Sequence, residues 1–250
     1  MVLDVEIDIE TSYELVKEIY QQIKPDELRS LGLRVEEKVD LFQHFLSSEN
    51  AILNLSIDEL KHILLKMFST KRASKKWSNE QFELFKSYAS KLLFGNEPFE
   101  ERFNYFCSVA KTNLALKQPY ELASELLTFS DPDRWWIWGK WMWNEASESG
   151  SLSLVFKEKN YFKADSLAKL YEIIGLAQKK LLESAHELGI IDHGTSRTSR
   201  FDIPIFLGAV YSVYMFTITR VQMTNEFTTI LPPKFELIQR LLGIYENKNK

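Results

Sequence analysis

The chain has 250 residues, of which 45% are hydrophobic and 26% are charged, so it is long and apolar enough to bury a core and is not a disordered chain. Only nine glycines and seven prolines occur, which favours long helices over an all-β protein with many tight turns. A net charge of −4 argues against a dedicated nucleic-acid-binding protein, and the single cysteine excludes an internal disulfide and a cysteine-based metal site within the chain.

The first ten residues alternate between apolar and acidic side chains. Val5, Ile7 and Ile9 interleave with four carboxylates, which predicts an edge strand or an extended acidic arm that needs a pairing partner. The stretch has neither the basic nor the apolar region of a secretory leader, so we expect a cytoplasmic protein.

Helix start signals dominate the rest of the chain. Three capping boxes are predicted, at Thr11 with Glu14, Ser56 with Glu59, and Ser78 with Gln81. Four prolines stand where a helix can begin, namely Pro25, Pro98, Pro119 and Pro132. Helices are further expected over residues 165–188 and 234–245, and over 204–231, where Pro204 opens the helix.

Residues 203–219 contain no charged side chain. A helix that is apolar all round is either a core helix or a membrane span, and this one is at the short edge for a span, so we interpret it as a core helix with no membrane span. The predicted fold is all-α, an irregular bundle of about eight to ten helices around a hydrophobic central helix near residues 204–231.

One basic stretch divides the chain. Lys71, Arg72, Lys75 and Lys76 precede Trp77 between two predicted helices. We expect an N-terminal helical subdomain with an acidic arm over residues 1–70 and a main helical domain over residues 78–250, which could pack as one unit. The same loop is a candidate nucleic-acid contact, a partner class that the overall charge does not favour.

Metal and catalytic signals are weak. Glu59 with His62, and Glu183 with His186, have the spacing of helix-bundle di-iron sites. On a helical wheel both pairs lie away from the apolar arcs, so no metal, cofactor or catalytic residue is predicted. Cys107 follows Phe106 on an aromatic helix and is expected to be a buried structural thiol.

The polar loop over residues 189–202 offers a candidate anion site. His193, Arg197 and Arg200 lie there among hydroxyl side chains, and guanidinium groups with exposed loop amides suit phosphate or carboxylate. A solvated loop is the alternative interpretation.

The most unusual feature is a cluster of five tryptophans within nine residues. The side chains are Trp135, Trp136, Trp138, Trp141 and Trp143. If Pro132 begins a helix here, they occupy two faces, with Trp136 and Trp143 sharing one. We expect a core sandwich, a protein interface centred on that face, or a stacking surface for a ligand or base.

Two stretches are similar to helical proteins of prokaryotes. They are the sequence from Asp131 to Trp138, and Val210 to Met215 together with Leu231 to Gly243. The likeness suggests a helical accessory subunit like those that accompany sulfur-oxidising heterodisulfide-reductase-like complexes, and it carries over no functional residue.

The preferred hypothesis is a non-catalytic helical subunit or adaptor of a multi-protein assembly, with the aromatic helix as its interaction surface and a protein partner or a second copy bound there. The first alternative is a cofactor- or small-ligand-binding protein, or an accessory subunit of a redox complex. The second is a nucleic-acid-associated protein that uses residues 71–77. Whether the chain is an enzyme is left open, with the non-enzyme hypothesis preferred.

Overall fold

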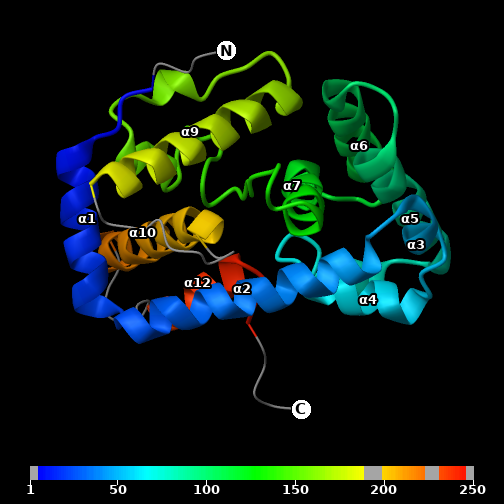
Figure 1. Ribbon diagram of the computed structural model, residues 1–250, viewed down its shortest axis with the longest axis horizontal. Helices are drawn as coiled ribbons and strands as arrows, with labels where there is room; N and C mark the ends of the chain where they lie inside the picture. The colour runs from blue at the N-terminus through cyan, green and yellow to red at the C-terminus, as the bar shows by residue number, and fades with distance from the viewer. Residues whose placement is uncertain (1–4, 189–198, 223–230, 246–250) are drawn as a thin grey trace. The chain divides into compact units, whose positions relative to one another are not determined.

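A computed structural model describes residues 5–188, 199–222 and 231–245, except for the side chains of residues 199–200 and 218–222. The described residues confirm the all-α prediction (Figure 1). The α-helices are α1 Ile9–Gln22, α2 Pro25–Phe45, α3 Glu49–Leu53, α4 Ile57–Leu65, α5 Asn79–Phe94, α6 Phe99–Asn113, α7 Pro119–Ser130, α8 Leu152–Val155, α9 Leu167–Glu187, α10 Ser199–Gln222 and α12 Lys234–Leu241. Two short 3₁₀ helices, η1 Ser74–Lys76 and η2 Lys159–Tyr161, lie between them.

The chain folds into two compact units, each built from separate stretches of sequence. Unit 1 comprises residues 1–36, 140–161 and 177–250, and unit 2 comprises residues 37–139 and 162–176. Helices α2 and α9 each contribute one part to unit 1 and the other part to unit 2.

Helix α7 is the enclosed helix of unit 2. Pro119 and every residue from 121 to 129 are buried, although four of these side chains are polar. Helix α6 packs against both α5 and α7, and α5 also contacts α3 and α4. Pro119 stands in the first turn of α7, as predicted, because a proline there loses no helical hydrogen bond.

Helix α10 is the enclosed helix of unit 1. Its described side chains from residue 201 to residue 213 are mostly buried, and it packs against α1 and α12 (Figure 1). The helix begins at Ser199 rather than at Pro204, because a proline one turn into a helix removes a single hydrogen bond and does not end the helix. No described helix has both the length and the apolar character that a membrane crossing requires.

The N-terminal stretch finds its pairing partner within unit 1. Ile7 forms an isolated antiparallel bridge with Phe156, and the Asp8 backbone N–H donates to the Val155 carbonyl at 3.0 Å. The predicted capping box at Thr11 is wrong, because Asp8 caps α1 by accepting a hydrogen bond from the Thr11 backbone N–H at 3.0 Å. The helix therefore starts one turn earlier than the sequence pattern indicates.

Two other predicted helix starts are confirmed and a third is shifted. Ser56 with Glu59 and Ser78 with Gln81 form reciprocal capping boxes at the starts of α4 and α5. Pro98 is the residue before the first turn of α6 rather than the first helical residue, a shift of one position.

Candidate functional sites

The helix predicted from Pro132 does not form. Asp131 follows the last residue of α7 in a non-helical conformation, because a residue before proline is disfavoured in helical geometry. Pro132 then lies in a turn in which the backbone N–H groups of Arg134 and Trp135 donate to the Asp131 carbonyl. Residues 135–139 continue without helical structure. The aromatic cluster is therefore an irregular segment, which we call the Trp segment (residues 131–143).

The Trp segment is held by hydrogen bonds to other elements in place of helical ones. In unit 2 the Trp138 backbone N–H donates to the buried Ser124 hydroxyl on α7, and the Trp138 ring stacks on Tyr120 at 4.0 Å between centroids. In unit 1 the Trp141 carbonyl accepts from the Ser151 backbone N–H at 3.0 Å. Each tryptophan can thus enter its own environment, which a regular helix with two faces does not allow.

Three of the five tryptophans are buried within the chain. The exposed fractions are 1% for Trp138, 4% for Trp141 and 0% for Trp143, whereas Trp135 and Trp136 are half-buried. The prediction that Trp136 and Trp143 share an exposed helical face is wrong, because the segment is not helical and Trp143 is fully buried. Trp136 packs against Gly175 of α9, where an added Cβ would lie 3.1 Å from the indole ring, a tight contact.

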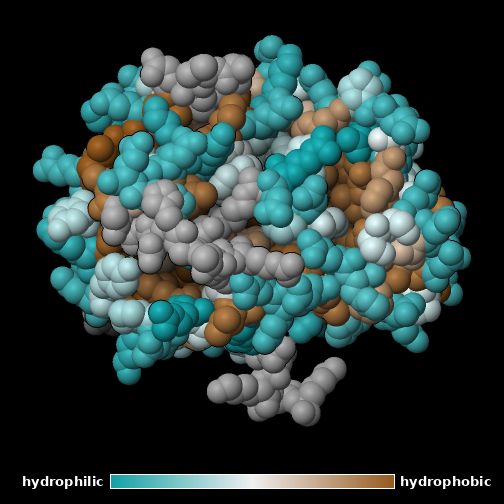
Figure 2. Space-filling view, in the orientation of Figure 1, coloured by the Kyte–Doolittle hydropathy of each residue, from teal (hydrophilic) through white to brown (hydrophobic). Residues whose placement is uncertain are grey.

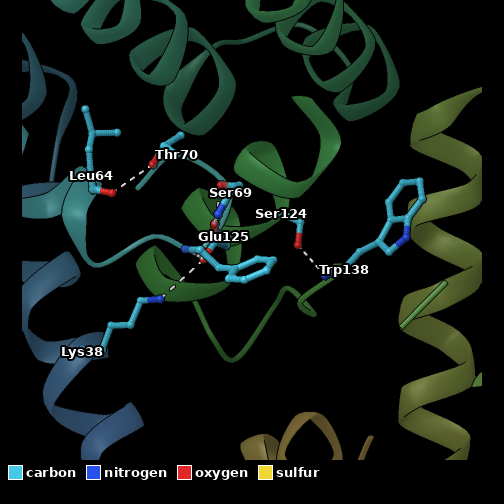
Figure 3. Close-up of polar contacts among 8 residues, drawn as sticks. Lys38, Leu64, Ser69, Thr70, Ser124, Glu125 and Trp138 are labelled. Carbon is cyan, nitrogen blue, oxygen red and sulfur yellow. Dashed lines mark hydrogen bonds and ion pairs between the residues drawn. The ribbon is translucent and has the colours of Figure 1, made fainter. Parts of the chain in front are cut away.

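A buried carboxylate lies on α7 in unit 2 (Figure 3). Glu125 on α7 accepts from the Phe68 backbone N–H at 2.9 Å, from the Ser69 backbone N–H at 3.1 Å and from the Ser69 hydroxyl. The Lys38 ammonium on α2 lies 3.6 Å from the same carboxylate and 3.8 Å from the centre of the Phe129 ring. Both side chains of the ion pair are 4% exposed or less.

The environment of this pair indicates a structural role. Burial lowers the pKa of Lys38 to about 8, although the Glu125 carboxylate opposes that shift by favouring the charged ammonium. Both carboxylate oxygens accept hydrogen bonds from the segment after α4, so the pair fastens that segment to α2 and α7. No sequence pattern points to this ion pair, because Lys38 and Glu125 are far apart in the chain.

The basic stretch is partly ordered as helix η1. Arg72, Lys75 and Lys76 are exposed, and Lys71 is half-buried. The Trp77 indole N–H donates to the Leu114 carbonyl at 3.3 Å, and its ring packs against Phe82 and Phe85. That ring therefore contributes to the core of unit 2, and the nucleic-acid contact remains a prediction carried by the lysines and Arg72.

The candidate anion loop lies almost wholly outside the described residues. His193 and Arg197 belong to residues 189–198, and Arg200 is described only as part of the α10 backbone. The arrangement of these three side chains is therefore left open.

The surroundings of Cys107 and of the two Glu-x-x-His pairs favour neither catalysis nor metal binding. Burial raises the pKa of the Cys107 thiol to about 12, which disfavours the nucleophilic thiolate. Glu59 accepts from the Ser56 backbone N–H as part of a helix cap, and Glu183 is exposed. Among the described side chains, no group of three potential ligands is close enough to hold a metal ion.

A half-exposed stripe on α1 escaped the sequence interpretation. The exposed fractions are 56% for Ile9, 54% for Tyr13 and 52% for Tyr20. At 100° per residue these three side chains lie within about 40° of one another on the helix, so they form one stripe, which we call the α1 stripe. The Lys17 ammonium lies 4.5 Å from the centre of the Tyr13 ring. The period-two pattern of residues 1–10 predicts an edge strand or an extended arm at Ile9, which hides the helical stripe.

Apolar side chains also reach the surface of unit 2. Over α5 and α6 the space-filling view shows brown residues among hydrophilic ones (Figure 2), and Phe94 and Tyr105 on those helices are exposed. Tyr105 contacts Lys91 and the ring of Tyr88, so its exposed side chain already has neighbours in its own unit.

No protein-family model, curated protein or solved structure matches this chain. The likeness to accessory subunits of redox complexes therefore depends only on the two stretches quoted from the sequence.

Proposed function

We propose that this protein is a non-catalytic helical subunit or adaptor that binds a partner protein through the α1 stripe. The observation that carries the proposal is the alignment of Ile9, Tyr13 and Tyr20, all more than half exposed, along one side of a single helix. Contiguous apolar and aromatic side chains on a surface mark interaction sites far more often than isolated ones do. Tyrosine is also among the residues that contribute most to binding energy at interfaces.

Another side of α1 has its partners within unit 1. Ile19 is buried in the helix, and α1 packs against α8 and α10. The α1 stripe is therefore held on a helix that is already fixed, so a partner would bind a preformed surface without ordering it first.

The charges around the stripe define the chemistry of the partner. Glu10 and Glu14 flank the stripe on one edge, and Glu6, Asp8 and Glu18 lie nearby in sequence. Lys17 forms an ion pair with Glu14 and Lys157 forms one with Glu6, so five carboxylates face two lysines and the surface stays acidic. A protein segment with an apolar face bordered by lysine or arginine complements this surface. We therefore propose a basic amphipathic helix of another protein as the occupant.

The test compares two variants of the full chain purified from its natural host. Tyr13→Ala with Tyr20→Ala removes two of the three side chains of the stripe, and Tyr105→Ala removes an exposed tyrosine from unit 2. After purification at low salt, quantitative mass spectrometry should find one protein in stoichiometric amount with the wild type and with Tyr105→Ala. A photo-crosslinker placed at Tyr20 should form a crosslink to a basic segment of that protein. The stripe variant should no longer co-purify with the partner.

Two results would contradict the proposal. One is the absence of any stoichiometric partner at low salt. The other is a partner that the stripe variant retains and that crosslinks elsewhere. Melting temperatures of the three proteins should agree within a few degrees, because the substituted side chains are exposed.

A further inference from the structure

A cleft of about 240 Å³ lies in unit 2 where three helices end. The C-terminal ends of α2, α5 and α7 contribute to its walls, together with Arg102 on α6 and the start of the Trp segment. All of its lining residues belong to residues 37–139, so the cleft is formed within one unit.

Two arginines line the cleft, and neither forms an ion pair with a described carboxylate, although the Glu97 carboxylate lies within electrostatic reach of Arg102. Arg102 is only 8% exposed, its Nε donates to the Glu97 carbonyl at 2.9 Å, and its Nη1 donates to the Leu92 carbonyl at the end of α5. Arg134 has its guanidinium 4.7 Å from the centre of the Trp135 ring. Neither guanidinium forms an ion pair with a described carboxylate, and a buried cation is normally paired.

The two guanidinium groups also influence each other. Burial lowers the pKa of Arg102 and the positive charge of Arg134 lowers it further, whereas the Glu97 carboxylate opposes both shifts, so the two cations are within electrostatic reach. An anion between them would relieve that repulsion and replace part of the hydration that Arg102 has lost.

A buried hydroxyl gives a second, independent indication of a ligand. Ser130, the last residue of α7, lines this cleft, and its side-chain oxygen is buried without a hydrogen-bond partner. Buried polar atoms without a partner are rare in folded proteins and are costly. A ligand oxygen could accept the hydrogen bond that this hydroxyl can donate.

The remaining walls determine what else the ligand carries. The Trp135 ring is held rigidly because it stacks on Phe99, with 4.5 Å between centroids, and Leu93 and Leu127 add aliphatic surface. The Asp131 carboxylate also lines the cleft and would repel a multiply charged anion. The cleft is smaller than those that hold drug-sized ligands.

We propose that this cleft binds a small organic monocarboxylate, with its carboxylate between Arg102, Arg134 and the Ser130 hydroxyl and its apolar part against Trp135. The site is independent of the α1 stripe, so either proposal can fail without the other.

The experiment uses benzoate, phenylacetate and isovalerate as probes of the full-length protein, measured by isothermal titration calorimetry and saturation-transfer NMR. At least one should bind with a Kd of about 1 mM or lower, the affinity expected of a ligand with about ten non-hydrogen atoms. The uncharged amide of the same probe should bind at least about tenfold more weakly, because it lacks the charge that the arginines recognise. Inorganic phosphate at the same concentration should not displace the probe.

Two variants and one control locate the site. Arg134→Gln removes an exposed cation at the cleft and should weaken binding about tenfold, whereas Arg72→Gln, an exposed arginine elsewhere in unit 2, should change nothing. Ser130→Ala should weaken binding several-fold while leaving the melting temperature of the free protein equal or higher, because it deletes an unpaired buried hydroxyl. Failure of all three probes to bind at 10 mM, equal binding of acid and amide, or binding that neither variant affects would overturn the proposal.

Discussion

Helices α7 and α10 are each enclosed by their own unit, but the side chains that they bury differ in polarity. The described interior of α10 is apolar except for Ser212, whose hydroxyl donates to the Lys234 carbonyl at 3.3 Å. Helix α7 buries Glu121, Ser124, Glu125 and Thr128. An apolar helix needs only a space of the right shape, whereas a polar one needs a specific partner for each buried group.

The comparison shows how unit 2 positions its irregular parts. Ser124 holds the Trp segment and Glu125 holds the segment after α4, so two neighbouring residues of α7 fix two stretches without regular structure (Figure 3). Helix α10 is instead packed mainly by apolar contacts with helices. Substitutions in the two units should therefore differ in size, in pH dependence and in sign.

The largest effect is expected for Glu125→Ala. The variant leaves the Lys38 ammonium buried without its carboxylate and removes the acceptor of the Phe68 and Ser69 backbone N–H groups. The free energy of unfolding should fall by about 3–5 kcal/mol, as for other broken buried pairs. Urea denaturation at pH 7 measures it. Adding Lys38→Met should recover part of the loss, and a single-variant loss below about 1 kcal/mol would show that the pair does not fasten the unit.

A somewhat smaller loss is expected for Leu207→Ala in α10. Leu207 is fully buried, so the variant leaves a cavity in an apolar environment. The free energy of unfolding should fall by about 3 kcal/mol. The loss should be the same at pH 7 and at pH 9.5, since no charge is involved. Leu33→Ala, at an exposed position of unit 1, is the matched control and should change stability little.

A pH effect should distinguish unit 2 further. The pKa of Lys38 is about 8 in the folded protein, below its ordinary value, so between these two values the unfolded chain binds more protons than the folded one. Stability therefore rises with pH in that interval. Relative to Lys38→Met, the wild type should gain about 1.5 kcal/mol between pH 8 and pH 9.5, measured by urea denaturation at both values. If the difference in stability between the wild type and Lys38→Met were the same at both pH values, the pKa of Lys38 would not be lowered in the folded protein.

The smallest effect is expected at two buried glycines and should differ in sign. A Cβ at Gly208 in α10 would lie 3.4 Å from Ile238, which is ordinary contact, so Gly208→Ala should stabilise by up to about 1 kcal/mol through helix propensity. A Cβ at Gly175 in α9 would lie 3.1 Å from the Trp136 ring, so Gly175→Ala should gain nothing or destabilise. Thermal denaturation of both variants tests the contrast, and equal gains would show that Trp136 yields easily.

The sequence by itself determined the elements whose signals are local. The capping boxes at Ser56 and Ser78 start α4 and α5 as predicted, because a cap involves residues three apart. The apolar stretch from residue 203 predicts a core helix, since hydrophobicity on all sides is visible in the sequence alone.

Only the tertiary structure decided the Trp segment and the buried polar groups. Asp131–Pro132 is compatible with a helix start and with a turn, and the choice depends on α7 continuing to Ser130 and on Ser124 meeting the Trp138 backbone. Lys38 and Glu125 lie on predicted helices, but nothing in the residues around either one indicates that they form a buried ion pair with each other. Helix caps and hydrophobic periodicity depend on neighbouring residues, whereas the partners of a buried polar group come from distant parts of the chain.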